Sequence, residues 1–257
     1  MANYHMEVQV ISRGKGRSVT KLSSYIAGKN LYDGYLNKTH YNKRQDVLYC
    51  EIFLPKNAPS NFYDLQHLCY EIDAAEKRYD ARTAREFKCS LPNELPLREQ
   101  IQIVDAFIEK NFTVHRLCAV AAIHEGRNAE DPSRNNPHVH IIVPTREVGP
   151  DGFVLKKNRE YDKKEYVEIW RKDWALVQNR AYERNGLDIR VSHESLEVQG
   201  VKREPVPHLS RIDFQREQRG MQTEAGARKR AIITRNIEKE REALDRRVRT
   251  LSLERSL

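Results

Sequence analysis

Three histidines lie where β-strands would bring their side chains together. His138 and His140 are two residues apart in an apolar stretch, and side chains at i and i+2 of a strand point to the same face. His124 ends the preceding apolar run, 117–123, and a loop rich in Gly, Asn, Asp and Pro separates the two runs. Two adjacent strands would thus offer three imidazole nitrogens to one divalent metal ion. The alternative is that the three histidines are hydrogen-bonded separately on a half-buried sheet. Their shared spacing disfavours this alternative.

Two groups of cations are candidate phosphate contacts. Between Ser12 and Ser18, three cations alternate with two glycines, so the backbone could approach a ligand closely while the cations neutralise phosphate. A solvated basic turn explains this segment equally well. A second basic cluster follows Leu155. The candidate contacts in the two groups are Arg13, Lys15, Arg17, Lys156, Lys157 and Arg159.

The elements that must position these residues follow from hydrophobic periodicity. Strands are predicted at 4–11, 47–54, 84–91, 117–123 and 138–143, and helices at 19–30, 62–79, 97–112 and 166–185. Residues 31–46 have no clean period and are expected to form a loop or an irregular hairpin. The order β-α-β-α-β-α-β-β, without a glycine-rich nucleotide loop, predicts an α+β fold with a mainly antiparallel central sheet flanked by helices.

Two further residues lie where they could join the histidines. Tyr25 falls in the helix predicted after the candidate N-cap Ser18, and the spacing places it on the apolar face, where a core tyrosine is the ordinary interpretation. Glu86 shares one face of the strand 84–91 with Lys88 and Ser90. A carboxylate there could serve the histidine edge, although an isolated strand glutamate more often faces solvent.

The composition describes a soluble protein with one substantial core and a tail. The chain has 257 residues, 39% hydrophobic and 32% charged, and a mean hydropathy of −0.78. No apolar run approaches the ~18 residues of a membrane span, so no membrane insertion is expected. The first residues lack the features of a secretory signal, and four widely spaced cysteines are expected to stay reduced, so we expect the cytoplasm. A net charge of +8 permits a nucleic-acid partner without establishing one.

Taken together, these motifs resemble the MobA/MobL family of plasmid mobilisation relaxases, a MOBQ-type branch of the HUH endonucleases. The resemblance covers about residues 1–210, with the motifs in the family's order. The N-terminal motifs are Tyr4-His5, Ser12 to Ser18 leading to Ser24-Tyr25, Ala84-Arg85-Glu86 and Leu91 to Leu95. The later motifs are His124, Asn136 to His140, Ser195 to Gly200, Glu204-Pro205 and His208-Leu209.

The resemblance implies roles for the site residues. Tyr25 would be the nucleophile, and His124, His138 and His140 would ligate a divalent ion, with Mg²⁺ or Mn²⁺ typical of the group. Glu86 would either orient a metal-bound histidine or accept the tyrosine proton. Glu94 is a further acidic candidate near the site.

It also implies a reaction and a domain organisation. The reaction is metal-dependent, strand-specific nicking and rejoining of DNA at a plasmid origin of transfer, through a covalent 5′-phosphotyrosyl intermediate. The partners would be the single-stranded nick region with its adjacent hairpin, and accessory relaxosome and coupling proteins in the bacterial cytoplasm. Residues 1–210 would form the nicking domain, and 211–257 a charged helical extension or linker.

Two other functions remain open at this stage. A rolling-circle replication initiator or single-strand transposase would share the chemistry, but the tyrosine upstream of the histidines argues against both. A DNA-binding module of a mobilisation complex, with structural histidines, would need no nucleophile.

Overall fold

The centre of the protein is a five-stranded sheet in which every neighbouring pair is antiparallel. The computed structural model describes residues 4–128, 131–132 and 135–254. The strand order is β1-β5-β7-β6-β4. The strands are β1 Met6–Ser12, β4 Val47–Phe53, β5 Arg82–Ser90, β6 Ala119–His124 and β7 His138–Pro144. The α+β prediction is confirmed, and each predicted strand boundary lies within two residues of the observed one.

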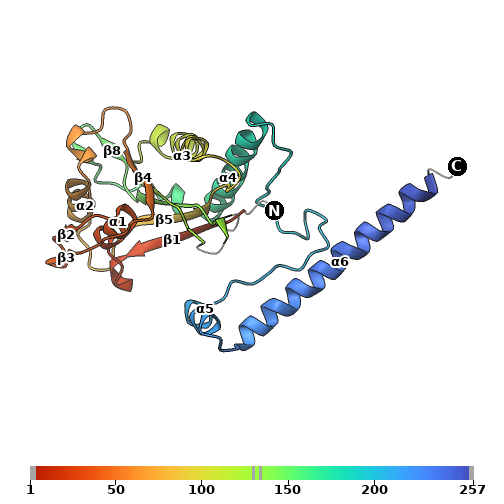
Figure 1. Ribbon diagram of the computed structural model, residues 1–257. Coiled ribbons are helices and arrows are strands. Elements are labelled where there is room, and N and C mark those ends of the chain that lie inside the picture. Colours follow the sequence, from red (N-terminus) through yellow and green to blue (C-terminus); the bar gives the residue numbers. More distant parts are fainter. Residues whose placement is uncertain (1–3, 129–130, 133–134, 255–257) are drawn as a thin grey trace. The chain divides into compact units, whose positions relative to one another are not determined.

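Two pairs of helices cover the two faces of this sheet (Figure 1). On one face, α3 Leu97–Asn111 and α4 Lys164–Arg184 pack over Phe87 and Ile123. On the other, α1 Val19–Ala27 and α2 Leu65–Ala74 pack over Val120. Alternate residues of β6 therefore enter different cores, which explains why this strand is apolar along almost its whole length.

Smaller elements complete the first unit. Strands β2 Leu31–Asp33 and β3 Lys38–His40 form a hairpin in the segment expected to be a loop or irregular hairpin. Strands β8 Val148–Gly149 and β9 Gly152–Phe153 form a second one. The helix predicted over 62–79 is shorter, because the Asp64 side chain accepts a hydrogen bond from the backbone N–H of His67 and caps α2 there.

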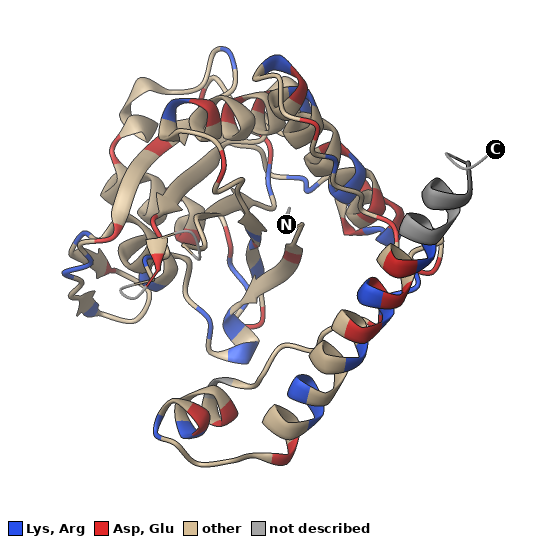
Figure 2. Ribbon diagram, turned by 45° about the vertical axis from the view of Figure 1, so that its right-hand side comes forward, with Lys and Arg blue, Asp and Glu red and all other residues tan. Residues whose placement is uncertain are grey.

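The chain divides into two compact units, residues 1–193 and 194–257. The second holds α5 Arg211–Gln218 and α6 Glu224–Glu254. Cationic and acidic residues are interspersed along both helices up to residue 246 (Figure 2). The division precedes the expected boundary at residue 210, because Glu204 pairs with Arg235 at 2.7 Å and Lys239 at 2.9 Å on α6. No helix in the described part of the chain is long and apolar enough to cross a membrane.

Candidate active site

The three predicted histidines form one cluster at the shared end of β6 and β7. Antiparallel pairing places His124 directly opposite His138, and His140 lies two residues further along β7 on the same face. One ring nitrogen from each residue lies within 4.8 Å of the other two, and the ring centres are 4.9–5.3 Å apart. His124 and His140 are buried. The strand period therefore creates the cluster expected from the sequence.

The other ring nitrogen of each histidine donates a hydrogen bond to an oxygen that can only accept. Nδ1 of His138 lies 2.8 Å from the carbonyl of Asn136, and Nε2 of His124 lies 2.8 Å from the carbonyl of Ile26. Nδ1 of His140 lies 2.9 Å from a carboxylate oxygen of Glu86. A neutral imidazole that donates from one nitrogen keeps a lone pair on the other, so each ring is set to act as a ligand.

An unpaired buried nitrogen shows that the cluster fits a metal ion. Nδ1 of His124 is buried and has no hydrogen-bond partner among the described residues. Burial, with a smaller contribution from the Arg44 charge and the neighbouring histidines, lowers the pKa of His124 to about 4, and burial likewise lowers the pKa of His138. Both rings are therefore neutral at pH 7, the form that binds metal. The three residues could therefore hold a divalent metal ion.

Tyr25 lies at the edge of this site. Its ring centre is 6.2 Å from that of His124 and 6.1 Å from that of His140, in edge-on geometry. The expectation that Tyr25 lies on the apolar face of its helix is wrong: Val19 and Ile26 fill the core, whereas Tyr25 is 43% exposed. A helix turns by about 100° per residue, so the neighbour of buried Ile26 comes to the rim of the core. A hydroxyl there is accessible to a substrate.

Arg44 is a site residue that the sequence patterns missed. Its guanidinium carbon lies 4.4 Å from the centre of the Tyr25 ring, a cation–π geometry. Its Nε donates to Asp46 at 2.7 Å, and this hydrogen bond lowers the pKa of the Asp46 carboxyl to about 2. The backbone carbonyl of Asp46 accepts from Glu125, the residue after His124. Arg44 lies in the segment without a period, so no local signal pointed to it.

Glu86 is buried between a histidine of the cluster and a cation. One carboxylate oxygen accepts from His140 and the other from Arg17 at 2.6 Å. Burial raises the pKa of Glu86, but the hydrogen bond from His140 and the nearby cations outweigh it, and the pKa is lowered. Glu86 is therefore an ionised carboxylate that holds the His140 ring in place.

Comparison with known proteins places the chain in a family. The model of the MobA/MobL family matches residues 17–219. The chain belongs to the MobA/MobL family. It is 29% identical to a probable mobilization protein MobA of Bifidobacterium longum, over 81% of this chain and 43% of that protein. It is 28% identical to mobilization protein MobL of Acidithiobacillus ferridurans, over 98% of this chain and 76% of that protein.

A solved structure from work on the molecular basis of vancomycin resistance transfer in Staphylococcus aureus is also similar. Its TM-score is 0.68 at 28% identity, over 76% of this chain and all of the other. This MobA/MobL chain spans less than half the length of the Bifidobacterium relative.

The three predicted cations between Ser12 and Ser18 have different surroundings in this MobA/MobL fold. Arg17 pairs with Glu86 at the site. The Arg13 side chain is buried, and its guanidinium bonds Asp73 at 2.8 Å and the carbonyl of Glu76, at the end of α2. Lys15 is exposed to solvent. Of these three cations, only Arg17 contacts a residue that is itself hydrogen-bonded to the histidine cluster.

The remaining predicted residues lie elsewhere. Lys156, Lys157 and Arg159 line a cavity at the opposite end of the sheet. Glu94 is exposed, and its carboxylate lies near Tyr182 of α4, whose pKa is raised by burial and then by Glu94. No contact between Glu94 and the three histidines is found in the part of the chain that the structure describes.

Proposed function

We propose that this chain nicks and rejoins one strand of DNA at a plasmid origin of transfer, with Tyr25 as the nucleophile. The observation that carries the proposal is the position of an exposed tyrosine whose ring centre lies within 6.2 Å of those of two histidines in a three-histidine cluster that could hold a metal ion. Nucleophile and electrophilic centre are then close enough to share one scissile phosphate. The relatives named as mobilization proteins support this assignment.

The reaction is a transesterification in two reversible steps. The phenol of Tyr25 loses its proton and its oxygen bonds to phosphorus, while the bond from phosphorus to the 3′ oxygen breaks and that oxygen gains a proton. The products are a 5′-phosphotyrosyl strand and a free 3′-hydroxyl. Rejoining reverses these changes without ATP, because the phosphoester bond energy is retained.

The metal-site residues prepare this chemistry. His124, His138 and His140 would hold the ion, and Glu86 would keep the His140 ring in its ligating orientation. A divalent ion held there supplies electrostatic stabilisation for the negative charge that develops on the phosphate oxygens. We propose Mg²⁺ or Mn²⁺, the ions with which HUH enzymes generally work.

The substrate would be the single-stranded nick region with its adjacent hairpin, and the partners the accessory and coupling proteins of mobilisation in the bacterial cytoplasm. Exposed Lys15 is a candidate phosphate contact near β1. We propose the first compact unit, residues 1–193, as the core of the nicking domain, and the charged helical part after residue 210 as an extension.

A covalent-adduct assay tests the proposal. The protein is incubated with a single-stranded oligonucleotide from the nick region of its plasmid, with Mg²⁺ or Mn²⁺ or with EDTA, and run on a denaturing gel. We expect a shifted band that requires the metal and is lost in Tyr25→Phe but kept in Tyr63→Phe, which removes an exposed hydroxyl elsewhere. Tight binding of the oligonucleotide without any shifted band would instead establish a DNA-binding module.

A further inference from the structure

The loop between β6 and β7 is closed at its base by a glycine. Gly126 lies two residues beyond His124, and Asn136 lies two residues before His138, so the two meet where the β6–β7 pairing ends. The backbone N–H of Asn136 donates to the carbonyl of Gly126 at 2.9 Å. This bond continues the hydrogen bonding between the two strands that carry the histidines. The base of the loop is therefore part of the frame of the histidine cluster.

The carbonyl of Asn136 is the point at which this loop meets the cluster. Nδ1 of His138 donates to its oxygen at 2.8 Å, and this acceptor fixes both the orientation of the ring and its tautomer. With the proton on Nδ1, the lone pair of the neutral ring stays on Nε2. A displacement of this one carbonyl would therefore act directly on the His138 ring.

Gly126 leaves no room for a side chain beside that carbonyl. Its φ is +58°, in the left-handed region. A Cβ at this position would lie 2.0 Å from the carbonyl oxygen of Asn136 and 2.6 Å from the carbonyl carbon. Cβ atoms essentially never approach another heavy atom within 3.0 Å, so the carbonyl would have to move by about 1 Å or more. Close approach of two backbones, as well as backbone conformation, therefore requires glycine here.

The chain is held on both sides of this contact. On the β6 side, the backbone N–H of Glu125 donates to the carbonyl of Asp46 at 2.9 Å. On the β7 side, the backbone N–H of Leu91 donates to the carbonyl of buried Pro137 at 2.8 Å. The peptide group between Asn136 and Pro137 is thus the part that would have to turn, and its oxygen would leave the imidazole from which it accepts.

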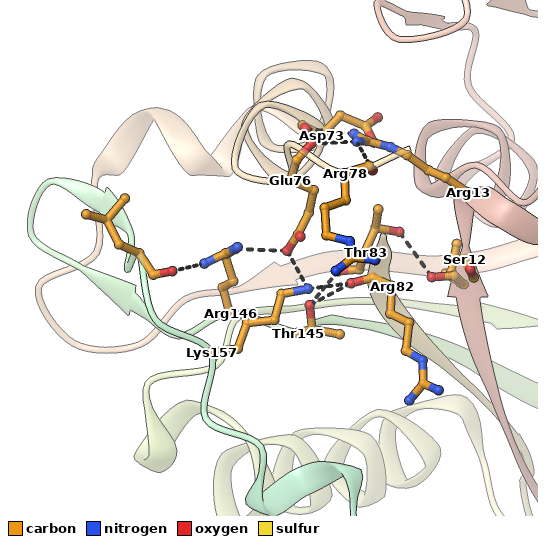
Figure 3. A network of polar contacts seen from close by, with 12 residues as sticks. Ser12, Arg13, Asp73, Glu76, Arg78, Arg82, Thr83, Thr145, Arg146 and Lys157 are labelled. Carbon is orange, nitrogen blue, oxygen red and sulfur yellow. Dashed lines mark hydrogen bonds and ion pairs between the residues drawn. The ribbon is translucent and has the colours of Figure 1, made fainter. Parts of the chain in front are cut away.

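The opposite end of β7 is fastened in a different way. Thr145 follows the last residue of β7, and its hydroxyl donates to the carbonyl of Arg82, the first residue of β5, at 3.0 Å (Figure 3). Its backbone N–H donates to the carbonyl of Thr83 at 3.0 Å. The side-chain hydrogen bond at that end can be removed without touching the histidine cluster. It provides a control for a general loosening of the strand.

We propose that Gly126 is a positioning residue for the metal site, and that it acts on His138 through the carbonyl of Asn136. Because residue 126 has no side chain, the carbonyl can hold the His138 ring as a ligand. The inference deepens the proposed function: it rests on the role of the three histidines as metal ligands, and not on strand transfer by Tyr25. Loss of the outer partner of a ligating histidine typically weakens metal binding by about 10- to 100-fold.

Gly126→Ala and Gly126→Asn test this proposal. Both bring a Cβ, but Asn tolerates a positive φ, as Asn37 and Asn57 do in this chain. Isothermal titration calorimetry measures Mn²⁺ affinity. Long-range ¹H–¹⁵N NMR of the metal-free protein at neutral pH identifies the ring nitrogen of His138 that carries the proton. For both variants we expect Mn²⁺ affinity to fall by about 10- to 100-fold, and the His138 proton to be no longer confined to Nδ1.

Two controls share the side effects of these variants. Gly186→Ala places a Cβ at a φ of +69°, where no heavy atom of the described residues other than its chain neighbours lies within 4 Å. It therefore has the backbone penalty without the contact. Thr145→Val removes the side-chain hydrogen bond at the other end of β7. We expect both controls to lower the melting temperature in EDTA and to keep the wild-type Mn²⁺ affinity and the wild-type tautomer of His138.

Three results would overturn the proposal. The first is wild-type Mn²⁺ affinity with an unchanged His138 tautomer in folded Gly126→Ala or Gly126→Asn, and the second is an equal loss in the controls. The third is a wild-type His138 ring that carries its proton on Nε2, which can be measured whether or not the variants fold. None of these measurements needs DNA or Tyr25. A failed adduct assay would therefore leave the proposal standing, whereas a wild-type protein that binds no Mn²⁺ would overturn it.

Discussion

The imidazole of His124 donates a hydrogen bond of 2.8 Å to the backbone carbonyl of Ile26, the residue that follows Tyr25 in α1. This bond joins a proposed metal ligand in the sheet to the helix that carries the proposed nucleophile, across 98 positions of sequence. It also assigns the proton of His124 to Nε2, which leaves Nδ1 for the metal. One contact therefore links the orientation of the His124 ring to the helix that carries Tyr25.

Removal of one ligand is expected to abolish tight metal binding. His138 is the least buried of the three, so His138→Ala disturbs the core least. We expect Mn²⁺ affinity, measured by isothermal titration calorimetry, to fall by more than about tenfold, the lower limit for loss of even an outer partner of a ligand. His115→Ala, which removes an exposed histidine in the short 3-10 helix Thr113–His115 before β6, serves as control. Unchanged Mn²⁺ affinity in His138→Ala would contradict the three-histidine site.

Glu86→Gln tests the two roles that the carboxylate could have. If Glu86 orients His140, the variant should bind Mn²⁺ about 10- to 100-fold more weakly, and excess Mn²⁺ should restore adduct formation. If Glu86 instead accepted the tyrosine proton, metal affinity would stay unchanged while the adduct disappeared at every Mn²⁺ concentration. We expect the first result, because both carboxylate oxygens already accept hydrogen bonds from His140 and Arg17.

Arg44→Ala is expected to slow adduct formation without changing metal binding. A cation over an aromatic face contributes about 1 kcal/mol, which corresponds to roughly a fivefold change in rate if it serves to hold the Tyr25 ring. Single-turnover adduct formation and Mn²⁺ calorimetry measure the two effects separately. Arg44→Lys should recover part of the rate. A large loss of Mn²⁺ affinity in Arg44→Ala would show that Arg44 instead supports the histidines.

The buried His124 should make the metal-free protein less stable in acid. Its pKa in the folded state, about 4, lies below the ordinary value of about 6.5, so between these values the unfolded chain takes up more protons. This contribution to stability is complete above about pH 6.5 and is lost as the pH falls toward 4, by up to about 3 kcal/mol. Urea denaturation in EDTA measures it. The difference between wild type and His124→Asn should shrink as the pH falls, and a constant difference would contradict the assignment.

The histidine cluster and the sheet were predictable because both follow from local periodicity. A strand repeats every two residues, so the spacing of His138 and His140 places them on one face, and apolar runs buried on both sides mark the central strands. The position of Tyr25 was harder to predict. Helical spacing placed it with the apolar residues, whereas packing of α1 on the sheet decided that Ile26 is buried and Tyr25 exposed.

The sequence by itself therefore determined the family, the strand pattern and the clustering of the three histidines. The tertiary structure decided what the cations do. Arg17 and Glu86 are 69 positions apart, and Lys157 lies far along the chain from Glu76, yet both pairs form because the fold brings the groups together. A long cationic side chain can meet phosphate, solvent or a distant carboxylate with little change in local sequence. The partner of each cation depends on how separate elements of the fold pack together. This packing exists only in the folded chain.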